Sequence, residues 1–538
     1  MNFLKKYYLH IACICILIIA FAHNWSISLW DQDEAAYAGI AKNMVETNNW
    51  LIPEFMWSEI HRKPPLHFWD IAISYNIFGI NEFAVRFPST IFILLTYFFV
   101  FYWGKKIFSG NTSLVGTLVL STTLLVPVLA KVSVTDATLL FFSTLAALSV
   151  IRLLQERSLK FTLIFWFAFA GALLIKGPPI IIFTGIFVVL LFIFHPGRKN
   201  LLRLHPWFFL PIAIAPLFLW GYLTTLRDGG AFVNWMYDWY IAKRVGGSVL
   251  GQSGPPGMHA ALITGFFIPY FMFLPKAFWN GIIGIKKKEK EDLLLGAWFV
   301  AGWLIYEFSP SKLPAYCIVA HVPLALLIGK RILHYTKENS TPNKALQGVQ
   351  FTLLVLITTA LSVASFVMDL SLSLKITLIT FNAVMILGIV MVMRLREKIP
   401  FSYSIIGLNF VFLFVITVVI LPQIDVFKDA PRRVAYYVKE NANPESHVVL
   451  ANKKGSPPSL PFYHSLYFDE ISDEEDFIQL IDFYYSPNPY VLVLNLDLKE
   501  QFEAHDPSLE FEEISAFYVD RKGLAAYYVL MNQSATVK

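Results

Sequence analysis

The sequence of 538 residues is poor in charged residues and in cysteine. Asp, Glu, Lys and Arg make up 15% of the chain, whereas hydrophobic residues make up 56%, more than the roughly 45–50% of a soluble domain. The three cysteines, Cys13, Cys15 and Cys317, lie in apolar stretches, so we expect no framework of disulfide-bonded loops. We also find no internal repeat and no low-complexity segment. A soluble globular protein and a small disulfide-stabilised domain are therefore excluded.

The amino terminus lacks a clear signal-peptidase site. Residues 1–25 begin with basic residues and continue as an apolar core, as a signal peptide does. No small-x-small pattern follows, and further apolar segments do. We therefore predict that this segment is retained as the first membrane helix.

Apolar runs of about 17–23 residues, each long enough for a helix that crosses the bilayer, recur along the chain. They predict a polytopic all-α membrane protein with about thirteen transmembrane helices. The predicted spans lie near residues 7–25, 86–103, 112–130, 137–152, 161–175, 178–194, 207–224, 261–281, 293–308, 314–329, 346–368, 375–393 and 402–421.

Basic clusters mark every second connection between these spans. They include Lys5 and Lys6, "GKK" from residue 104, "IKKKEKED" from residue 285 and "RLREK" from residue 394. The positive-inside rule places these clusters, and the amino terminus, in the cytoplasm. Loops 26–85 and 225–260 and everything after residue 424 then lie outside. The net charge of +5 is dispersed over these clusters, so we expect no nucleic-acid partner.

The last part of the chain has a different composition. Residues 425–538 contain the short β-rich runs "HVVLANKK", "YVLVLNLDL" and "AAYYVLMN", separated by acidic, helix-compatible stretches. We predict two domains. Residues 1–424 form a transmembrane catalytic domain whose loop 26–85 carries interfacial helices, and residues 425–538 form a small soluble α/β domain on the outer face.

Ionisable side chains gather on the predicted outer face. The acids are Asp31, Asp33, Glu34 and Asp136, and the lysines are Lys63, Lys131, Lys176 and Lys312. Lysines are unexpected on this face, so as a set they indicate an anionic ligand at the membrane interface. Any one lysine alone would more often be an interfacial side chain that reaches toward the headgroups. Acids at the start of a helix stabilise its dipole without any catalytic role.

The stretches "DEAAYAGIAKNM", "RKPPLHFW", "RFPST", "TDATLLFF", "KGPP" and "SKLPAY" occur in this order on one side of the membrane. The ordered set resembles the bacterial family 39 glycosyltransferases of the protein O-mannosyltransferase type, which include the lipid A aminoarabinose transferases. The resemblance implies the GT-C fold and a location in the inner membrane of Gram-negative bacteria. It also implies inverting transfer of a sugar from a polyprenyl monophosphate carrier to an acceptor hydroxyl at the periplasmic face.

The resemblance also implies roles for individual residues. Asp33 matches the catalytic aspartate of the family, and Lys63 matches the lysine that contacts the donor phosphate. The other matching positions are Tyr37, Asp136, Lys176, Lys312 and Tyr316. Of these we assign Lys176 and Lys312 to the donor phosphate and the rest to substrate support, together with Asp31 and Glu34. Arg244, in "IAKRVGG", is a further candidate for phosphate or sugar, with an ordinary loop cation as the alternative.

Two positions depart from the aminoarabinose transferases. The relatives carry arginine where this chain has Ala36, and glutamate where it has Arg62. Both changes affect the donor pocket. We therefore expect a neutral hexose to be at least as good a candidate for the donor sugar as aminoarabinose. The acids of "DQD" leave a divalent metal open as an alternative, but a monophosphate carrier beside lysines has less need of one.

The acceptor class, which is lipid A, a protein or a glycan, is not specified by the sequence. Two other functions stay open. One is a glycan ligase that uses a lipid diphosphate donor. The other is a lipid or sugar transporter, which would more often place its charges near the bilayer midplane and show repeated halves.

Overall fold

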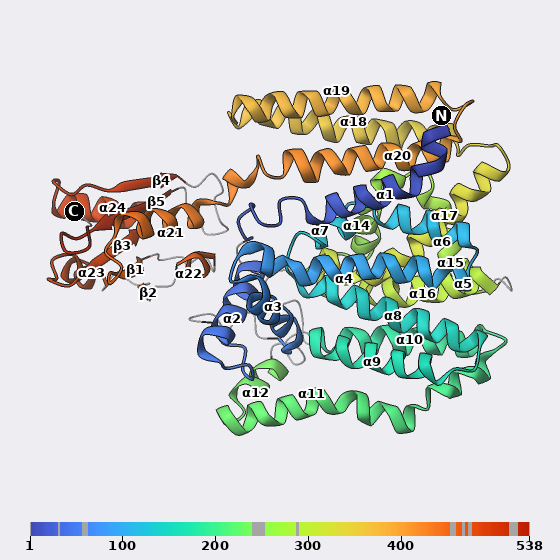
Figure 1. Cartoon of the computed structure of the whole chain (residues 1–538), viewed down its shortest axis with the longest axis horizontal. Helices are drawn as coiled ribbons and strands as arrows, with labels where there is room; N and C mark the ends of the chain where they lie inside the picture. Colours follow the sequence, from blue (N-terminus) through green and yellow to red (C-terminus); the bar gives the residue numbers. More distant parts are fainter. Residues whose placement is uncertain are drawn as a thin grey trace. The chain divides into compact units, whose positions relative to one another are not determined.

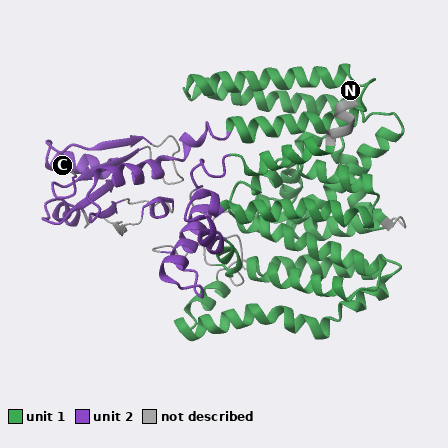
Figure 2. Ribbon diagram, in the orientation of Figure 1, with its two compact units in different colours: residues 1–22, 62–70, 86–420 green, residues 23–61, 71–85, 421–538 purple. Residues whose placement is uncertain are grey.

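The computed structural model describes residues 2–30, 33–55, 63–238, 253–286, 290–451, 459–464, 468–471, 476–515 and 526–536. It divides the chain into two compact units (Figure 2). The helical unit comprises residues 1–22, 62–70 and 86–420, and the mixed unit comprises residues 23–61, 71–85 and 421–538. The mixed unit therefore contains most of the predicted outer loop as well as the tail.

The helical unit is a bundle of apolar helices (Figure 1). Its elements are α1 (Asn2–Phe21), most of α4 (Glu82–Tyr102), α5 (Gly104–Ile107), α6 (Gly110–Leu120), α7 (Leu125–Leu129), α8 (Thr135–Gln155), α9 (Leu159–Lys176), α10 (Pro178–Phe194), η1 (Arg198–Leu204), α11 (Pro206–Asp228), α12 (Ala231–Tyr237), α14 (Met258–Phe266), η3 (Ile268–Tyr270), α15 (Leu274–Gly284), α16 (Lys290–Glu307), η4 (Pro314–Ala320), α17 (His321–Lys337), α18 (Lys344–Val367), α19 (Leu372–Arg394), α20 (Phe401–Phe414) and η5 (Val415–Ile420).

Eight helical segments in the described part of the chain are long and apolar enough to cross a membrane. They are Glu82–Ile107, Thr135–Gln155, Leu159–Lys176, Pro206–Asp228, Pro314–Lys337, Lys344–Val367, Leu372–Arg394 and Phe401–Ile420. Leu9–Phe21, Gly110–Leu120 and Pro178–Phe194 are shorter apolar helices. The mostly helical, membrane-spanning architecture is thus confirmed, and the number of thirteen spans stays a prediction.

Two of the predicted spans are interrupted helices. The span near 112–130 is divided into α6 and α7, because the hydroxyls of Ser121 and Thr122 bond to the Leu118 carbonyl and compete with the helical backbone pattern. The span near 261–281 is divided into α14, η3 and α15, where Pro269 and Pro275 lack the amide hydrogens that a continuous helix needs. Hydropathy alone does not register such breaks.

Glycine allows close packing between α6 and α17. A Cβ atom on Gly116 would lie 2.9 Å from Cα of Leu326, and one on Gly329 would lie 2.8 Å from the amide nitrogen of Gly116. Small residues commonly permit such approach between helices in membranes, where packing rather than the hydrophobic effect drives association. The α6–α17 contact therefore depends on these two glycines.

The mixed unit contains a five-stranded sheet of order β2-β1-β3-β5-β4. Its strands are β1 (His447–Ala451), β2 (Phe468–Ile471), β3 (Tyr490–Leu494), β4 (Glu512–Ser515) and β5 (Ala526–Met531). β1 runs parallel to β2 and β3, whereas β5 is antiparallel to β3 and β4. The three β-rich runs in the sequence correspond to β1, β3 and β5, and a separate α/β domain of residues 425–538 on the outer face stays a prediction.

Alternate residues of the strands pack on the two faces of this sheet. Val448, Val491 and Val529 pack with Val434 and Val438 of α21 (Ala430–Asn441). The following residues in each strand pack on the other face with α23 (Asp476–Tyr484) and α24 (Leu496–His505). Both faces are apolar, which explains why β1 and β3 are continuous hydrophobic runs.

The unit also contains η6 (Asp425–Phe427) and α22 (Ser459–Tyr463). The loop segments contribute α2 (Asp33–Thr47) and part of α3 (Leu66–Phe78), and the interfacial position predicted for the helices of loop 26–85 stays a prediction.

Candidate functional site

The acidic stretch after the first predicted span begins α2 in the mixed unit. Asp33 and Glu34 occupy the first helical turn, where the helix dipole favours negative charge. The Asp33 side chain is exposed, whereas Glu34 is 1% exposed, and its Oε2 accepts a hydrogen bond from the Trp30 amide at 2.8 Å. Tyr37 is buried one turn further along. Adjacent carboxylates therefore lie in opposite environments.

Ala36, where related enzymes carry arginine, is fully buried in α2. A guanidinium at this position would have to be accommodated inside the mixed unit rather than in solvent. The departure noted in the sequence therefore affects the packing of α2 as well as its charge. Asp31 and Arg62 lie outside the described residues.

A second group of predicted site residues meets in the helical unit. The Lys176 Nζ at the end of α9 lies 2.7 Å from Oδ1 of Asp136, in the first turn of α8. Their side chains are 18% and 13% exposed, respectively. The same ammonium lies 5.8 Å from the ring centroid of Tyr316, in η4. Three separate motifs, "TDATLL", "KGPP" and "SKLPAY", thus supply an ion pair and an aromatic ring to one place.

Lys312 has close protein partners of its own. It is 5% exposed, and its Nζ donates hydrogen bonds to the carbonyls of Tyr306 and Glu307 at 2.9 and 2.7 Å. The ammonium also lies 4.0 Å from Oε2 of Glu307. In this structure Lys312 thus stabilises the turn that follows α16, and its contact with a donor phosphate stays a prediction.

Lys131, another lysine on the predicted outer face, is also structural in its contacts. It is 5% exposed, and its Nζ donates a hydrogen bond to the carbonyl of Ala22 at 2.6 Å, just after the end of α1. Burial, and to a lesser extent the positive charge of Arg86, lowers the Lys131 pKa to about 7. An outer-face lysine in this chain is therefore not by itself a sign of a ligand.

Sequence reasoning missed two ionisable groups of this region. His259 at the start of α14 is buried, and its ring stacks on Tyr316 with centroids 6.2 Å apart. Burial lowers the pKa of His259. Glu307 accepts hydrogen bonds from the amides of Gly257 and Ala260 at 2.8 and 2.6 Å. A lone histidine in an apolar stretch carries little signal, but an acid that ends an apolar run beside "SPSKLP" could have been noticed.

The remaining candidates are only partly placed. Lys63 is half-buried in the helical unit, ahead of α3, and Arg244 lies outside the described residues. Within the described ranges, no group of three or more His, Cys, Asp and Glu side chains could hold a metal ion. A metal at the "DQD" stretch is not tested by this, because Asp31 is not among the described residues.

Comparisons with known proteins find similarity in both sequence and fold. Residues 62–221 match the family model for dolichyl-phosphate-mannose-protein mannosyltransferase. Over 330 residues the chain is 26% identical to the undecaprenyl phosphate-alpha-4-amino-4-deoxy-L-arabinose arabinosyl transferase 2 of Proteus mirabilis (strain HI4320). This match covers 60% of the chain and 58% of that enzyme. Over 469 residues the chain is also 26% identical to an uncharacterized protein of Aquifex aeolicus (strain VF5). This match covers 86% of the chain and 87% of that protein.

The fold agrees over a longer stretch than the sequence. The structure matches that of ArnT from Cupriavidus metallidurans bound to undecaprenyl phosphate with a TM-score of 0.78 and 19% sequence identity. This match covers 99% of both chains. The family model and the arabinosyl transferase thus agree with the resemblance seen in the motifs, and the likeness to the ArnT structure shows that the chain has the same fold.

Proposed function

We propose that this protein is an inverting glycosyltransferase of the bacterial inner membrane. It moves a sugar from a polyprenyl monophosphate carrier to an acceptor hydroxyl at the periplasmic face. The observation that supports this most strongly is the likeness in sequence to an undecaprenyl phosphate-dependent arabinosyl transferase, combined with the fold of a protein bound to undecaprenyl phosphate. The lysines and acids of the matched motifs supply the chemistry that this reaction needs.

Asp33 is the general base. Its carboxylate takes the proton of the acceptor hydroxyl as the oxygen attacks the anomeric carbon from the face opposite the leaving group. The bond from that carbon to the phosphate oxygen breaks, and its electron pair leaves with the lipid phosphate. A positioned general base of this kind contributes about 10²–10⁴-fold to the rate.

Cations stabilise the departing phosphate. Lys63 and Lys176 are the first candidates, and Lys312 and Arg244 support them. Charge that develops on a phosphate in a partly dehydrated site is stabilised more strongly than the same charge in water. The Asp136–Lys176 pair lets Lys176 keep a partner when no phosphate is bound, because Asp136 holds its ammonium at 2.7 Å.

The other matched residues support the substrates. Tyr316 lies against the Lys176 ammonium, and its ring is suited to stacking on a sugar. Glu34 and Tyr37 are buried in α2 and maintain the helix that begins with Asp33. Asp31 is proposed to act with them. No metal is required by this scheme.

Topology follows from the basic clusters. We propose thirteen membrane spans, a cytoplasmic amino terminus and a periplasmic tail, with the division between the catalytic membrane domain and the tail domain after residue 424. The supporting observations are the odd number of apolar runs and the alternation of basic connections along the sequence.

The test is transfer of radiolabelled sugar from polyprenyl monophosphate donors to membrane fractions that contain lipid A, protein and glycan acceptors. Both aminoarabinose and a neutral hexose are offered, because Ala36 and Arg62 change the donor pocket. Wild type is compared with Asp33→Asn and Lys63→Ala at equal amounts of folded protein. We expect wild type to label one acceptor class and both variants to fail.

Two outcomes would contradict the proposal. If only lipid diphosphate donors support labelling, the protein is a glycan ligase. If no donor supports labelling and the protein instead moves lipid or sugar across vesicles, it is a transporter.

A further inference from the structure

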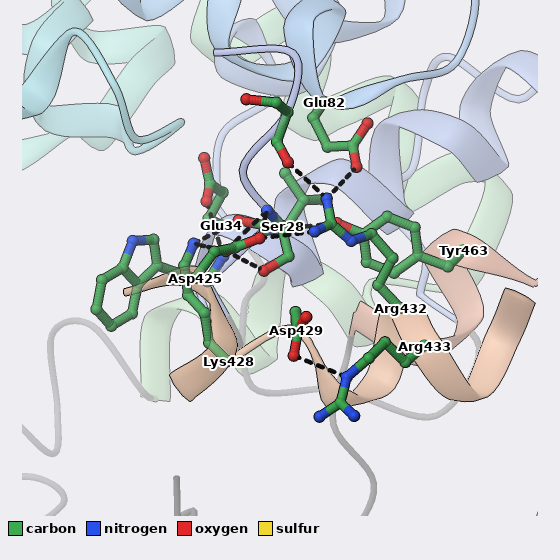
Figure 3. Close-up of polar contacts among 12 residues, drawn as sticks. Ser28, Glu34, Glu82, Asp425, Lys428, Asp429, Arg432, Arg433 and Tyr463 are labelled. Carbon is green, nitrogen blue, oxygen red and sulfur yellow. Dashed lines mark hydrogen bonds and ion pairs between the residues drawn. The ribbon is translucent and has the colours of Figure 1, made fainter. Parts of the chain in front are cut away.

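A buried carboxylate in the mixed unit, that of Asp425, lies at the centre of a polar network (Figure 3). Asp425 begins η6 and is 6% exposed. Both of its carboxylate oxygens lie 3.1 Å from the amide nitrogen of Ser28, and Oδ1 also accepts a hydrogen bond from Ser28 Oγ at 2.6 Å. The acid thus holds the amide and hydroxyl of a residue 397 positions earlier in the chain.

Arg432 in the first turn of α21 extends this network. Its Nη2 donates to Asp425 Oδ2 at 2.6 Å, and its Nη1 donates to the carbonyl of Ser26 at 2.8 Å. The same Nη1 lies 3.5 Å from Oε1 of Glu82. A cation in a first helical turn is disfavoured by the helix dipole, and the two carboxylates offset this. Arg432 therefore joins the tail to the residues that precede α2.

Two further tail residues hold the same short segment. Lys428 Nζ donates a hydrogen bond to the carbonyl of Ser28 and lies 4.8 Å from the ring centroid of Trp30. The hydroxyl of Tyr463 accepts a hydrogen bond from the amide of Leu29 at 2.8 Å. Backbone groups of residues 26, 28 and 29 are thus held by tail side chains, and so is the ring at residue 30.

Two hydrogen bonds join this held segment to the helix that begins with Asp33. The Trp30 amide donates to Glu34 Oε2 at 2.8 Å, and the Trp30 carbonyl accepts from the Ala35 amide at 2.9 Å. Both bonds therefore tie Trp30 to the first turn of α2. A shift of the segment would therefore move the turn on which Asp33 is placed.

The tail holds α2 at a second point. The buried Nζ of Lys42 donates hydrogen bonds to the carbonyls of Pro461 and Phe462 in α22, at 3.2 and 3.1 Å. Lys42 lies in the middle of α2. The helix is thus fixed by tail residues through the chain ahead of it and along its length.

We propose that Asp425 is a positioning residue for Asp33, and that the Asp425–Arg432 pair makes the tail part of the transfer machinery. The inference rests on the proposed function. Asp425 does not touch substrate; it fixes the backbone ahead of α2, which sets where the general base is held. A displacement of about 1 Å in a reacting group can cost about 10²-fold in rate.

The experiment compares wild type, Asp425→Asn and Asp429→Asn in detergent-purified full-length protein. Asp429 is the control, since it is a nearby, half-buried acid at the start of α21 that also pairs with an arginine, Arg433, at 3.0 Å. Transfer rates are divided by the amount of folded protein in the monodisperse fraction. The Kd for undecaprenyl phosphate is measured in parallel. Lys63, Lys176 and Lys312, which are proposed to bind the phosphate, lie in the helical unit, so a base displaced in the mixed unit should leave this Kd nearly unchanged.

We expect Asp425→Asn to lower kcat per folded molecule by about 10²-fold, as a misplaced base does, with the Kd changed less than threefold. Asp429→Asn should keep kcat within about twofold, because an ion pair of this kind contributes little. A purely structural role for Asp425 predicts less folded protein but an unchanged kcat.

Ser28→Ala covers the case in which Asp425→Asn fails to fold. It removes only the 2.6 Å hydroxyl bond and keeps both amide contacts, so we expect a loss of kcat that is clear but smaller than that of Asp425→Asn. If the folded variants turn over like wild type while wild type is active, the inference is overturned and the proposed function stands. If wild type transfers no sugar, the proposed function itself is overturned.

Discussion

Separate removal of each partner of the Asp136–Lys176 ion pair should have different consequences for donor binding. At 2.7 Å and an effective dielectric constant of about 20, the attraction is about 6 kcal/mol before the cost of desolvation. Because both side chains are largely buried, loss of either partner leaves an uncompensated charge and should lower the free energy of unfolding by about 3 kcal/mol.

Only loss of the lysine should weaken donor binding. A hydrogen bond from an ammonium to a phosphate is worth about 1.5–3 kcal/mol, so Lys176→Met should raise the Kd for undecaprenyl phosphate about 10–100-fold. Asp136→Asn should leave this Kd unchanged or lower it, because Lys176 loses its competing partner. The double variant should recover part of the stability that each single variant loses.

The assays are thermal unfolding in detergent and direct binding of undecaprenyl phosphate to the four proteins of the cycle. The informative comparison is between the two single variants, which lose the same ion pair. Equal increases in Kd for Asp136→Asn and Lys176→Met would refute the reasoning, since the pair would then be structural and Lys176 would not contact the phosphate.

Three further predictions concern other parts of the chain. Asp33→Asn should reduce transfer by about 10²–10⁴-fold but lower the unfolding free energy by less than about 1 kcal/mol, since its side chain is exposed. Glu46→Gln on the same helix should keep the rate and lower the unfolding free energy by at most about 0.5 kcal/mol, because its pair with Lys42 is long, at 3.9 Å, and the Glu46 side chain is exposed. Gly329→Leu should reduce the yield of folded protein, because an added Cβ would meet the backbone of α6, and Gly185→Leu, which has open space, is its control in a size-exclusion assay. Burial, with Lys42 and Lys439 nearby, lowers the pKa of His464 from 6.5 to about 4. The unfolded chain then binds this proton more readily, so stability of the mixed unit should fall as pH drops from about 6.5 to 4, and His464→Gln should reduce that loss in proteolysis at graded pH.

The sequence was sufficient to predict most of the fold, because apolar periodicity depends on residues that are close together in the chain. It located the helical membrane part and the three central strands of the tail. It did not register the break at Ser121 and Thr122, where side-chain hydroxyls compete with the backbone in a segment that is still apolar on average. It also did not indicate that residues 23–61 pack with the tail, because that association depends on tertiary contacts.

The candidate site was predicted less completely, because a motif reports residue types and not the partners of each side chain. The resemblance indicated Asp136, Lys176 and Tyr316, which the structure brings together. It gave no sign that Lys312 donates to two backbone carbonyls. Asp425 and Ser28 are 397 residues apart in the sequence, so no local sequence pattern could have predicted the hydrogen bond between them.

The pair of acids at the start of α2 illustrates how the environment separates residues that the sequence presents alike. Residues 34–42 of α2 are all buried, whereas Asp33, the first residue of the helix, is exposed. Glu34 is buried and uses its carboxylate on the Trp30 amide, whereas Asp33 keeps an exposed side chain on the same turn. We therefore expect the buried acid to fix the turn and the exposed acid to take part in the proposed proton transfer. Because Glu34 bonds the Trp30 amide and Asp425 bonds Ser28, the exposed acid begins a helix whose approach is held by two buried carboxylates.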